Sequence, residues 1–296
     1  MTLTQRTSHV SRPLLLAAGL AIAGILGLGT HIVLQQVLGV PYPDVHLVPA
    51  WATFLNKWSA WGAVVAIWLY DERHSPERTW LGRWLRIALI FLLVKETLRA
   101  AVMQGVVTTS YAIYLALAVP TIVAVIAGCG LAGLVARYVR GPGAIVLGGL
   151  AIAAFSELVW RPFVTVPLVE TINGLGLPNH DEVYGQPYGL HVLIPAFATY
   201  LEPVVGAVLF CRSIGGRSPS KAAFVTTMAC FLFLTGRIVS PLVWSFFGPF
   251  PVPAAFMSLF QFALENAVLI TGVFFSVRWF GRDDHTGFVG GNRQAR

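Results

Sequence analysis

The segment "HVLIPAFATYLEP", His191–Pro203, places a glutamate and a proline inside an otherwise apolar run. A closely similar segment, "HLVPAWATFLN", occupies His46–Asn56. Their shared parts, "PAFATYLE" and "PAWATFLN", agree at five of eight positions, and two of the three differences preserve aromatic character. The two copies lie 146 residues apart, which is about half of the chain. This spacing indicates an internal duplication.

The similarity between the two halves extends beyond this segment. Upstream, "VLGVPYPDVH" from Val37 corresponds to "GLGLPNHDEVY" from Gly174. Downstream, "IFLLVKE" from Ile90 corresponds to "CFLFLTG" from Cys230. Apolar segments match by coincidence easily, but this match crosses a polar connection and keeps its order. We therefore interpret it as a duplication, with coincidence as the alternative.

The composition is that of a protein with many membrane-spanning helices. Of the 296 residues, 56% are hydrophobic and only 11% are charged, and the mean hydropathy is +0.72. Soluble globular chains contain about 25% charged residues. An α-helix needs about 20 consecutive apolar residues to cross a bilayer. Eight stretches have this length, and we predict a span in each: 14–38, 49–70, 84–107, 112–136, 143–170, 187–211, 222–247 and 253–278.

Basic residues near the span ends predict the orientation of the bundle, because Lys and Arg are retained on the cytoplasmic side. Fifteen of the twenty basic residues lie in the N-terminal segment, in every second connection and in the C-terminal segment, all on one predicted side. The other four connections contain neither Lys nor Arg. We expect a multi-pass protein of a bacterial inner membrane with both termini in the cytoplasm. The net charge of +7 follows from this topology, and we expect no nucleic-acid partner.

These patterns predict an all-α membrane helix bundle of about eight spans in two parallel four-helix repeats. The first repeat covers residues 1–142 and the second residues 143–282, and residues 283–296 form a cytoplasmic tail. With four spans in each half, both halves have the same orientation. They are then related by an axis along the membrane normal, as in transporters built from parallel repeats.

Nine ionisable residues are expected inside the spans. Insertion of such a group costs about 2.5–3.5 kcal/mol, so the nine must be paired or hydrated. With a helical rise of about 1.5 Å per residue, Arg99, Arg161 and Arg237 lie roughly 15 Å below the outer ends of three spans. We predict a substrate-binding layer in the outer half of the bundle that consists of Lys57, Lys95, Arg99, Arg161, Arg237, Glu96, Glu157, Glu202 and Glu265.

Helical spacing predicts partners for two of the arginines. Glu157 and Arg161 are four residues apart, and Glu96 and Arg99 are three apart, so each couple shares one face of a helix. Such buried ion pairs can also simply specify how helices associate, which is the structural alternative for every residue of the layer.

Arg237 has no acidic residue nearby in its own span, and we expect Glu202 or Glu265 of a neighbouring helix as its counterion. Prolines stand beside the charges, and each proline leaves the carbonyl four residues earlier without its helical hydrogen bond. Pro203 is expected to free the carbonyl of Thr199, and Pro241 that of Arg237. Freed carbonyls inside a membrane tend to line a cavity. We therefore expect a polar chamber that opens towards the outer face.

The layer suggests a protein that binds and transports a small or lipid-linked anion, because guanidinium groups suit bidentate contacts with carboxylates and phosphates. One alternative is an outward-facing enzyme that acts on a lipid-linked phosphate or glycan, with a glutamate as general base. A further alternative is a non-catalytic subunit of a membrane complex. The expected partners are membrane lipids and the anion, and the protein could also form a homo-oligomer.

The sequence contains no motif that assigns a catalytic residue, a cofactor or a metal. Nucleotide-binding glycine motifs and the paired-histidine zinc signature are absent. We therefore expect neither cofactor nor metal, and the catalytic residues stay unassigned.

Overall fold

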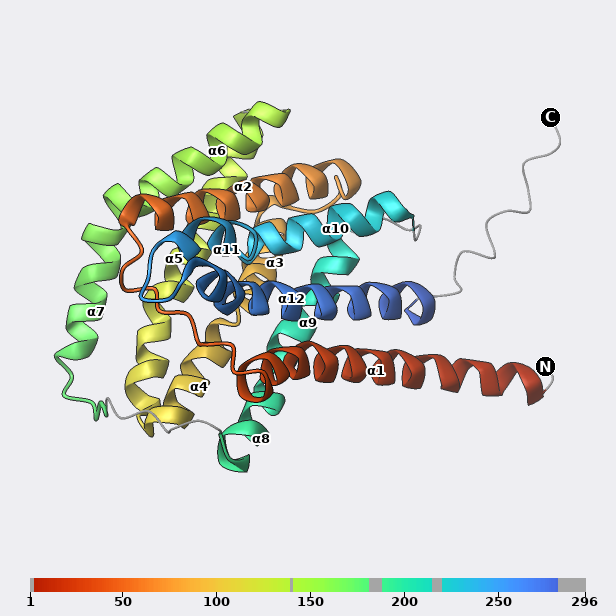
Figure 1. The fold of residues 1–296 in the computed structure, drawn as a ribbon. Helices are drawn as coiled ribbons and strands as arrows, with labels where there is room; N and C mark the ends of the chain where they lie inside the picture. Colours follow the sequence, from red (N-terminus) through yellow and green to blue (C-terminus); the bar gives the residue numbers. More distant parts are fainter. Residues whose placement is uncertain (1–2, 139–140, 181–187, 215–219, 282–296) are drawn as a thin grey trace.

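The computed structural model describes residues 3–138, 141–180, 188–214 and 220–281, with side chains from residue 12 onward. Within these ranges helices are the only regular secondary structure, and they comprise 83% of the residues (Figure 1). The predicted C-terminal tail, residues 283–296, lies outside the described residues.

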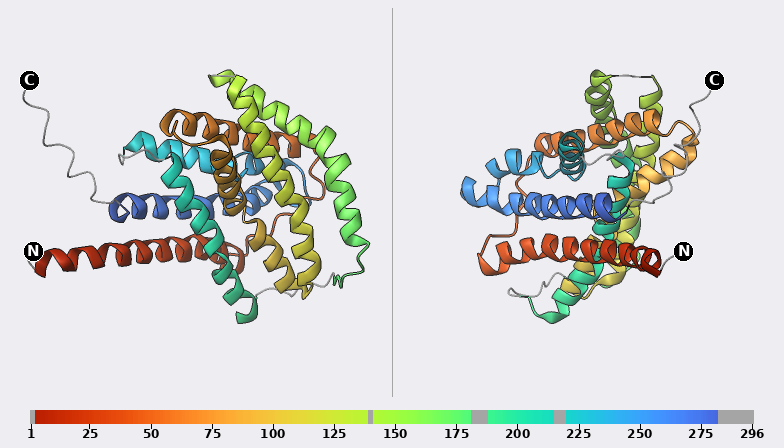
Figure 2. Two further views of the ribbon diagram at one scale, coloured as in Figure 1. Left: turned by 180° about the vertical axis from the view of Figure 1, so that it is seen from behind. Right: turned by 90° about the vertical axis from the view of Figure 1, so that its right-hand side faces the viewer.

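The first and last helices lie side by side and run antiparallel (Figures 1 and 2). Helix α1 (Leu3–Ile32) ends in the π-helical turn η1 (Val33–Val37), and α12 (Val252–Phe280) returns along it. Small residues allow this close approach: a Cβ atom on Gly272 would lie 2.6 Å from the Cβ of Ala23. The beginning of α1 and the end of α12 therefore lie at the same end of the bundle.

A second close contact joins α2 (Ala50–His74) to α6 (Pro142–Phe155). A Cβ atom on Gly149 of α6 would lie 2.7 Å from the backbone nitrogen of Gly62 of α2. Two glycines thus bring the two backbones together.

The α6 segment continues along the edge of the bundle. The π-helix η2 (Ser156–Thr165), which contains Pro162, follows α6 directly and leads into α7 (Val166–Asn173). These three elements pack on α5 (Tyr111–Tyr138).

Three of the remaining helical segments are broken. Helix α3 (Trp80–Val94) is followed by α4 (Thr97–Thr108), and α8 (Leu190–Thr199) by α9 (Leu201–Ile214). Helix α10 (Lys221–Leu234) is followed after a bend of 64° by α11 (Val239–Val243) and the short 3-10 helix η3 (Trp244–Phe246). Each break lies within one of the stretches that the sequence predicted to be a span.

Five helical segments of the described chain are long and apolar enough to cross a membrane, or six if the bent α10–α11 pair forms one span. Helix α2 does not belong to this set, and the polar Asn56 and Lys57 reduce its hydropathy. Helices α3 and α4 are shorter, with 15 and 12 residues. The protein is therefore a helix bundle with several potential membrane spans, and the number of eight stays a prediction.

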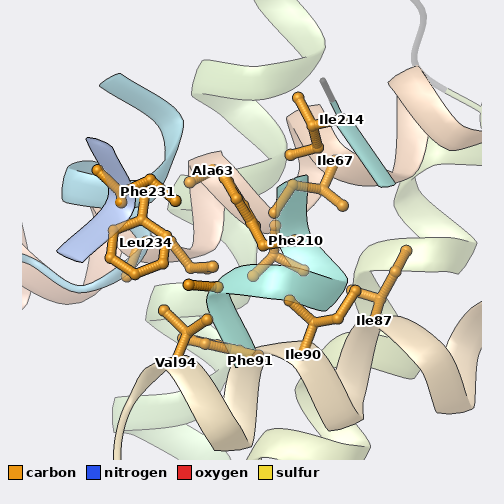
Figure 3. Close-up of a cluster of buried hydrophobic side chains, with 14 of the residues drawn as sticks. Ala63, Ile67, Ile87, Ile90, Phe91, Val94, Phe210, Ile214, Phe231 and Leu234 are labelled. Carbon is orange, nitrogen blue, oxygen red and sulfur yellow. The ribbon is translucent and has the colours of Figure 1, made fainter. Parts of the chain in front are cut away.

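One cluster of the hydrophobic core lies between α2, α3, α9 and α10 (Figure 3), and the core continues to residues of α1, α5, α6 and α12. The aromatic rings of Phe210 on α9 and Phe231 on α10 meet at 5.3 Å, nearly edge to face. Val94 and Leu234, the last residues of α3 and α10, are also fully buried. The core thus fixes the ends of α3 and α10 immediately before the two helices break.

One buried acid holds the turn between α2 and α3. Asp71 accepts hydrogen bonds from Arg83 at 2.8 Å and from Arg86 at 3.3 Å, and it also pairs with Arg78. The sequence indicated only that these arginines are cytoplasmic. Their shared pairing with Asp71 was not predicted, because the acid lies twelve residues before Arg83, on another helix.

We expect Gly149→Ala to destabilise the bundle, because the new methyl group would collide with the backbone of α2 rather than with a movable side chain. Such overpacking costs about 1–3 kcal/mol. The measurement is the melting temperature of the protein in detergent. Gly143→Ala is the matched control, since a Cβ atom at Gly143 meets nothing within 4 Å. Equal melting temperatures for the two variants would contradict the close contact.

Candidate functional site

A polar cavity of about 330 Å³ lies where the break between α3 and α4 faces the break between α10 and α11. This volume is at the lower end of the range of small-molecule sites, about 300–1,000 Å³. We call this cavity the chamber. Its lining residues are Tyr42, Pro43, Val45, Asn56, Val94, Lys95, Glu96, Thr235, Gly236, Arg237, Ser240, Trp244, Leu259, Phe262 and Asn266.

The first break contributes Lys95 and Glu96 to the chamber. The N–H of Glu96 donates to the carbonyl of Leu93 at 3.1 Å, and Glu96 has the left-handed backbone conformation, with φ of 56°. A non-glycine residue in this conformation costs roughly 1–2 kcal/mol. Strain of this kind persists where the surrounding structure holds it in place.

The second break contributes Gly236 and Arg237, and it has the hydrogen bonds of a Schellman motif. The N–H of Gly236 donates to the carbonyl of Phe233 at 3.0 Å, and the N–H of Arg237 donates to that of Leu232 at 2.8 Å. Gly236 is left-handed, with φ of 73°, which glycine adopts without strain. Each break therefore places a basic residue, Lys95 or Arg237, next to a left-handed residue in the chamber wall.

Glu202 caps the helix that begins after the first break. Its carboxylate accepts hydrogen bonds from the backbone N–H groups of Leu98, at 3.1 Å, and of Arg99. These N–H groups belong to the first turn of α4, where no intrahelical acceptor is available. A carboxylate at this position also interacts favourably with the helix dipole. Glu202 is thus bound to backbone and is not among the residues that line the chamber.

The other copy of the repeated segment reaches the second break. Asn56, which corresponds to Glu202 in the sequence match, lies directly against Gly236: a Cβ atom there would be 2.6 Å from the Asn56 side-chain oxygen. The two segments "PAWATFLN" and "PAFATYLE" therefore each end at a helix break that belongs to the other half of the chain.

The cations around the chamber differ in their pairing. Arg99 forms an ion pair with Glu96, as the three-residue spacing predicted, and its guanidinium lies 5.0 Å from the ring centroid of Tyr200. Lys95 and Arg237 have no carboxylate within 4.0 Å in the part of the chain that the structure describes. Of the two counterions expected for Arg237, Glu202 is therefore wrong, and Glu265 forms no ion pair with Arg237 within 4.0 Å. Glu202 caps α4 instead, and Glu265 interacts with Arg237 only over a longer distance.

Aromatic rings accompany the two unpaired cations. The ammonium of Lys95 lies 5.6 Å from the ring centroid of Phe91, and the guanidinium of Arg237 lies 4.6 Å from that of Phe262. A cation is attracted to the face of an aromatic ring, but less strongly than to an anionic group. Both positive charges therefore remain available to an anion in the chamber.

Glu265 is buried behind Phe262. Its carboxylate oxygen lies 3.7 Å from Nδ1 of His31, whose ring packs against Phe262 at a centroid distance of 4.7 Å. The Phe262 ring thus contacts both the guanidinium of Arg237 and the imidazole of His31. His31 was not predicted to belong to the site, because nothing in its neighbourhood in the chain indicates that α1 meets α12 at this point.

The predicted layer of nine charges divides into two clusters. Lys57, Glu157 and Arg161 form a cluster outside the chamber, in which both cations pair with Glu157. The Arg161–Glu157 pair confirms the pairing predicted from the four-residue spacing. The Arg161 side chain is 60% exposed on η2, at the edge of the bundle, so it does not share the surroundings of Arg99 and Arg237.

The chamber wall contains polar residues that were not predicted from the sequence, Asn56 and Asn266, beside Arg237, which was. The amide oxygens of Asn56 and Asn266 and the Nε of Arg237 are buried without a hydrogen-bond partner in the described chain. Buried polar groups in native proteins are usually hydrogen-bonded, so these three atoms mark a wall suited to a polar guest. The alignment of Asn56 with Glu202 was the one sequence signal that could have identified either asparagine.

The geometry defines the protein as a helical bundle with a charged internal chamber between two broken helices. No protein-family model, no curated protein and no solved structure matches the chain.

We expect Glu202→Ala to destabilise the start of α4. Hydrogen bonds to charged groups contribute about 1.5–3 kcal/mol each, and the substitution removes the acceptor of both. Hydrogen exchange followed by mass spectrometry should be faster at the amides of Leu98 and Arg99 and unchanged in α12. Glu202→Gln, which keeps one acceptor oxygen, should have an intermediate effect. Glu170→Ala, an exposed acid on α7, is the control. Unchanged exchange in α4 would exclude the capping role.

Proposed function

We propose that the protein is a membrane transporter that binds an anion in the chamber. The observation that carries this proposal is the pair Lys95 and Arg237, two cations in the wall of one cavity, neither of which has a carboxylate within 4.0 Å among the described residues. Arg99 stands behind them, neutralised by Glu96 when the chamber holds no anion. Binding of an anion between Lys95 and Arg237 replaces the water that would otherwise solvate both charges, in surroundings where electrostatic attraction is stronger than in water.

The proposed topology has eight crossings of a bacterial inner membrane, with both termini in the cytoplasm. The distribution of basic residues supports this orientation. The antiparallel α1–α12 pair, which brings the beginning of α1 and the end of α12 to one end of the bundle, supports an even number of crossings. The breaks in α3–α4 and α10–α11 then lie within the membrane. Irregular backbone is tolerated there when it lines a protein cavity.

We also propose that residues 1–142 and 143–282 are two parallel repeats. The breaks support this: the sequence match aligns Glu96 with Gly236, and both are the left-handed residue of their break. Packing supports it as well, because α3 lies against α9 and α10 lies against α2, which are corresponding pairs. The chamber thus lies between the halves, where a rocking motion of one repeat against the other would open it alternately to the two sides.

The remaining charges of the predicted layer have separate proposed roles. Glu265, close to His31, balances the arginines when the chamber is empty of substrate and is the proposed carrier of a coupling proton. Lys57, Glu157 and Arg161 connect α2 to η2 and are proposed to transmit movement between the halves.

We expect inorganic phosphate, sulfate or succinate to raise the melting temperature of the purified protein, and Arg237→Gln to abolish the rise. A ligand that binds only the folded state stabilises it by about 2.7 kcal/mol at one hundred times its dissociation constant. Proteoliposomes that contain the protein should take up the same anion, supplied in radiolabelled form.

The control for this experiment is Arg212→Gln, which removes an exposed cation at the end of α9. Lys95→Gln should weaken the response as Arg237→Gln does. If the two chamber variants and the control respond to anions like the wild type, the anion site is not in the chamber. Stabilisation by the anion without any uptake would support binding and contradict transport.

The orientation predicts opposite labelling of two introduced cysteines in intact cells. Leu175→Cys, in the exposed connection after α7, should react with a membrane-impermeant maleimide. Glu77→Cys, in the exposed connection between α2 and α3, should react only after lysis. Labelling of both sites in intact cells, or the reverse order, would contradict the proposed topology.

A further inference from the structure

An apolar groove of about 530 Å³ runs along the outside of α10 and α11. Its walls come from α2, α6, α10 and α11. The indole N–H of Trp58 in this wall donates to the carbonyl of Val146 at 2.9 Å, so it is not available to a guest. The lining residues are Leu55, Trp58, Ser59, Gly62, Ala63, Ala66, Ile145, Val146, Cys230, Phe233, Val239 and Val243.

The groove and the chamber share two walls. On α2, Leu55 and Trp58 face the groove, and Asn56 between them faces the chamber. On the broken helix, Phe233 and Val239 face the groove, and Gly236 midway between them faces the chamber. The partition at this point is the contact between Asn56 and Gly236. Gly236 has no side chain, and a Cβ atom there would collide with Asn56.

We propose that the groove holds the hydrocarbon chain of an amphiphilic anion, whose charged head group occupies the chamber. This inference rests on the proposed function and identifies its substrate class as a lipid anion. The groove offers apolar side chains at the depth of predicted spans, which suits a hydrocarbon chain and not a free polar ion. The chamber offers Lys95 and Arg237, which suit a phosphate or carboxylate head group.

The position of the Asn56–Gly236 contact supports a single lipid anion that occupies both the groove and the chamber. A lipid anion must keep its charged and apolar parts within a few bonds of each other. Here the unpaired Arg237 and the groove residue Val239 are two residues apart on one broken helix. Displacement of the Asn56 side chain from Gly236 would join the two spaces without movement of a helix backbone.

The test compares three ligands by thermal shift in detergent: dioleoyl phosphatidic acid, glycerol 3-phosphate and dioleoylglycerol. Phosphatidic acid has both the phosphate head group and the hydrocarbon chains, glycerol 3-phosphate has the head group alone, and dioleoylglycerol has the chains without the phosphate. Phosphatidic acid should stabilise the wild type at concentrations at least about tenfold lower than glycerol 3-phosphate, since its hydrocarbon chains bury apolar surface in the groove. Dioleoylglycerol should stabilise it much less than phosphatidic acid.

Ala66→Trp fills the groove from α2 and should remove the preference for phosphatidic acid without changing the response to glycerol 3-phosphate. Val146→Trp fills it from α6 at a side chain that is already 52% exposed, and it serves as a second variant that is less disruptive to folding. Ala100→Trp, on an exposed position of α4 outside the groove, is the matched control and should behave as the wild type.

The outcomes separate this inference from the proposed function. Stabilisation by glycerol 3-phosphate equal to that by phosphatidic acid would overturn the groove proposal and leave the anion site standing. A preference that survives both groove-filling variants would also overturn it, as would equal stabilisation by dioleoylglycerol. A response to none of the three ligands, nor to free inorganic anions, would overturn the proposed function itself.

Discussion

The arrangement depends on how backbone groups are satisfied where two helices break inside an apolar bundle. A break exposes N–H and carbonyl groups that cannot bond to water in such surroundings, and each unsatisfied group is costly. At the first break, the Glu202 carboxylate accepts hydrogen bonds from the N–H groups of Leu98 and Arg99. At the second, a Schellman motif around Gly236 bonds the chain end internally. The polar surface created by these two solutions, together with the basic residue beside each, is the chamber.

Part of this arrangement could be predicted from the sequence. Apolar composition indicated a helical bundle, and the spacing of Glu157 with Arg161 and of Glu96 with Arg99 predicted their pairing. The break at Gly236 had local signals, a glycine followed closely by Pro241. The break at Glu96 had none, because a glutamate in the left-handed conformation is unfavourable by itself and only tertiary contacts hold it there.

Contacts between helices could not be read from the chain. The likeness of "PAWATFLN" and "PAFATYLE" showed that Asn56 and Glu202 correspond, but not that each meets a break in the opposite half. Spacing along one helix likewise gave no information on Glu265 and His31, which lie on α12 and α1. The expectation of one continuous charged layer failed for a related reason. Depth in a span places residues at one level, but the rotation of each helix decides which of them face each other, and Arg161 faces outward.

The two breaks contribute charge to the chamber in different ways. In the first half the left-handed residue is Glu96, which neutralises Arg99, and in the second it is Gly236, which neutralises nothing. Glu202 adds no free negative charge to the chamber, because its carboxylate is hydrogen-bonded to the first N–H groups of α4. Two cations of the chamber wall thus have no carboxylate within 4.0 Å in the described chain, Lys95 at the first break and Arg237 at the second, and the apolar groove adjoins the chamber on the side of Arg237. Each break therefore contributes one cation without a carboxylate partner to the chamber, and only the second break places it beside a surface suited to a hydrocarbon chain.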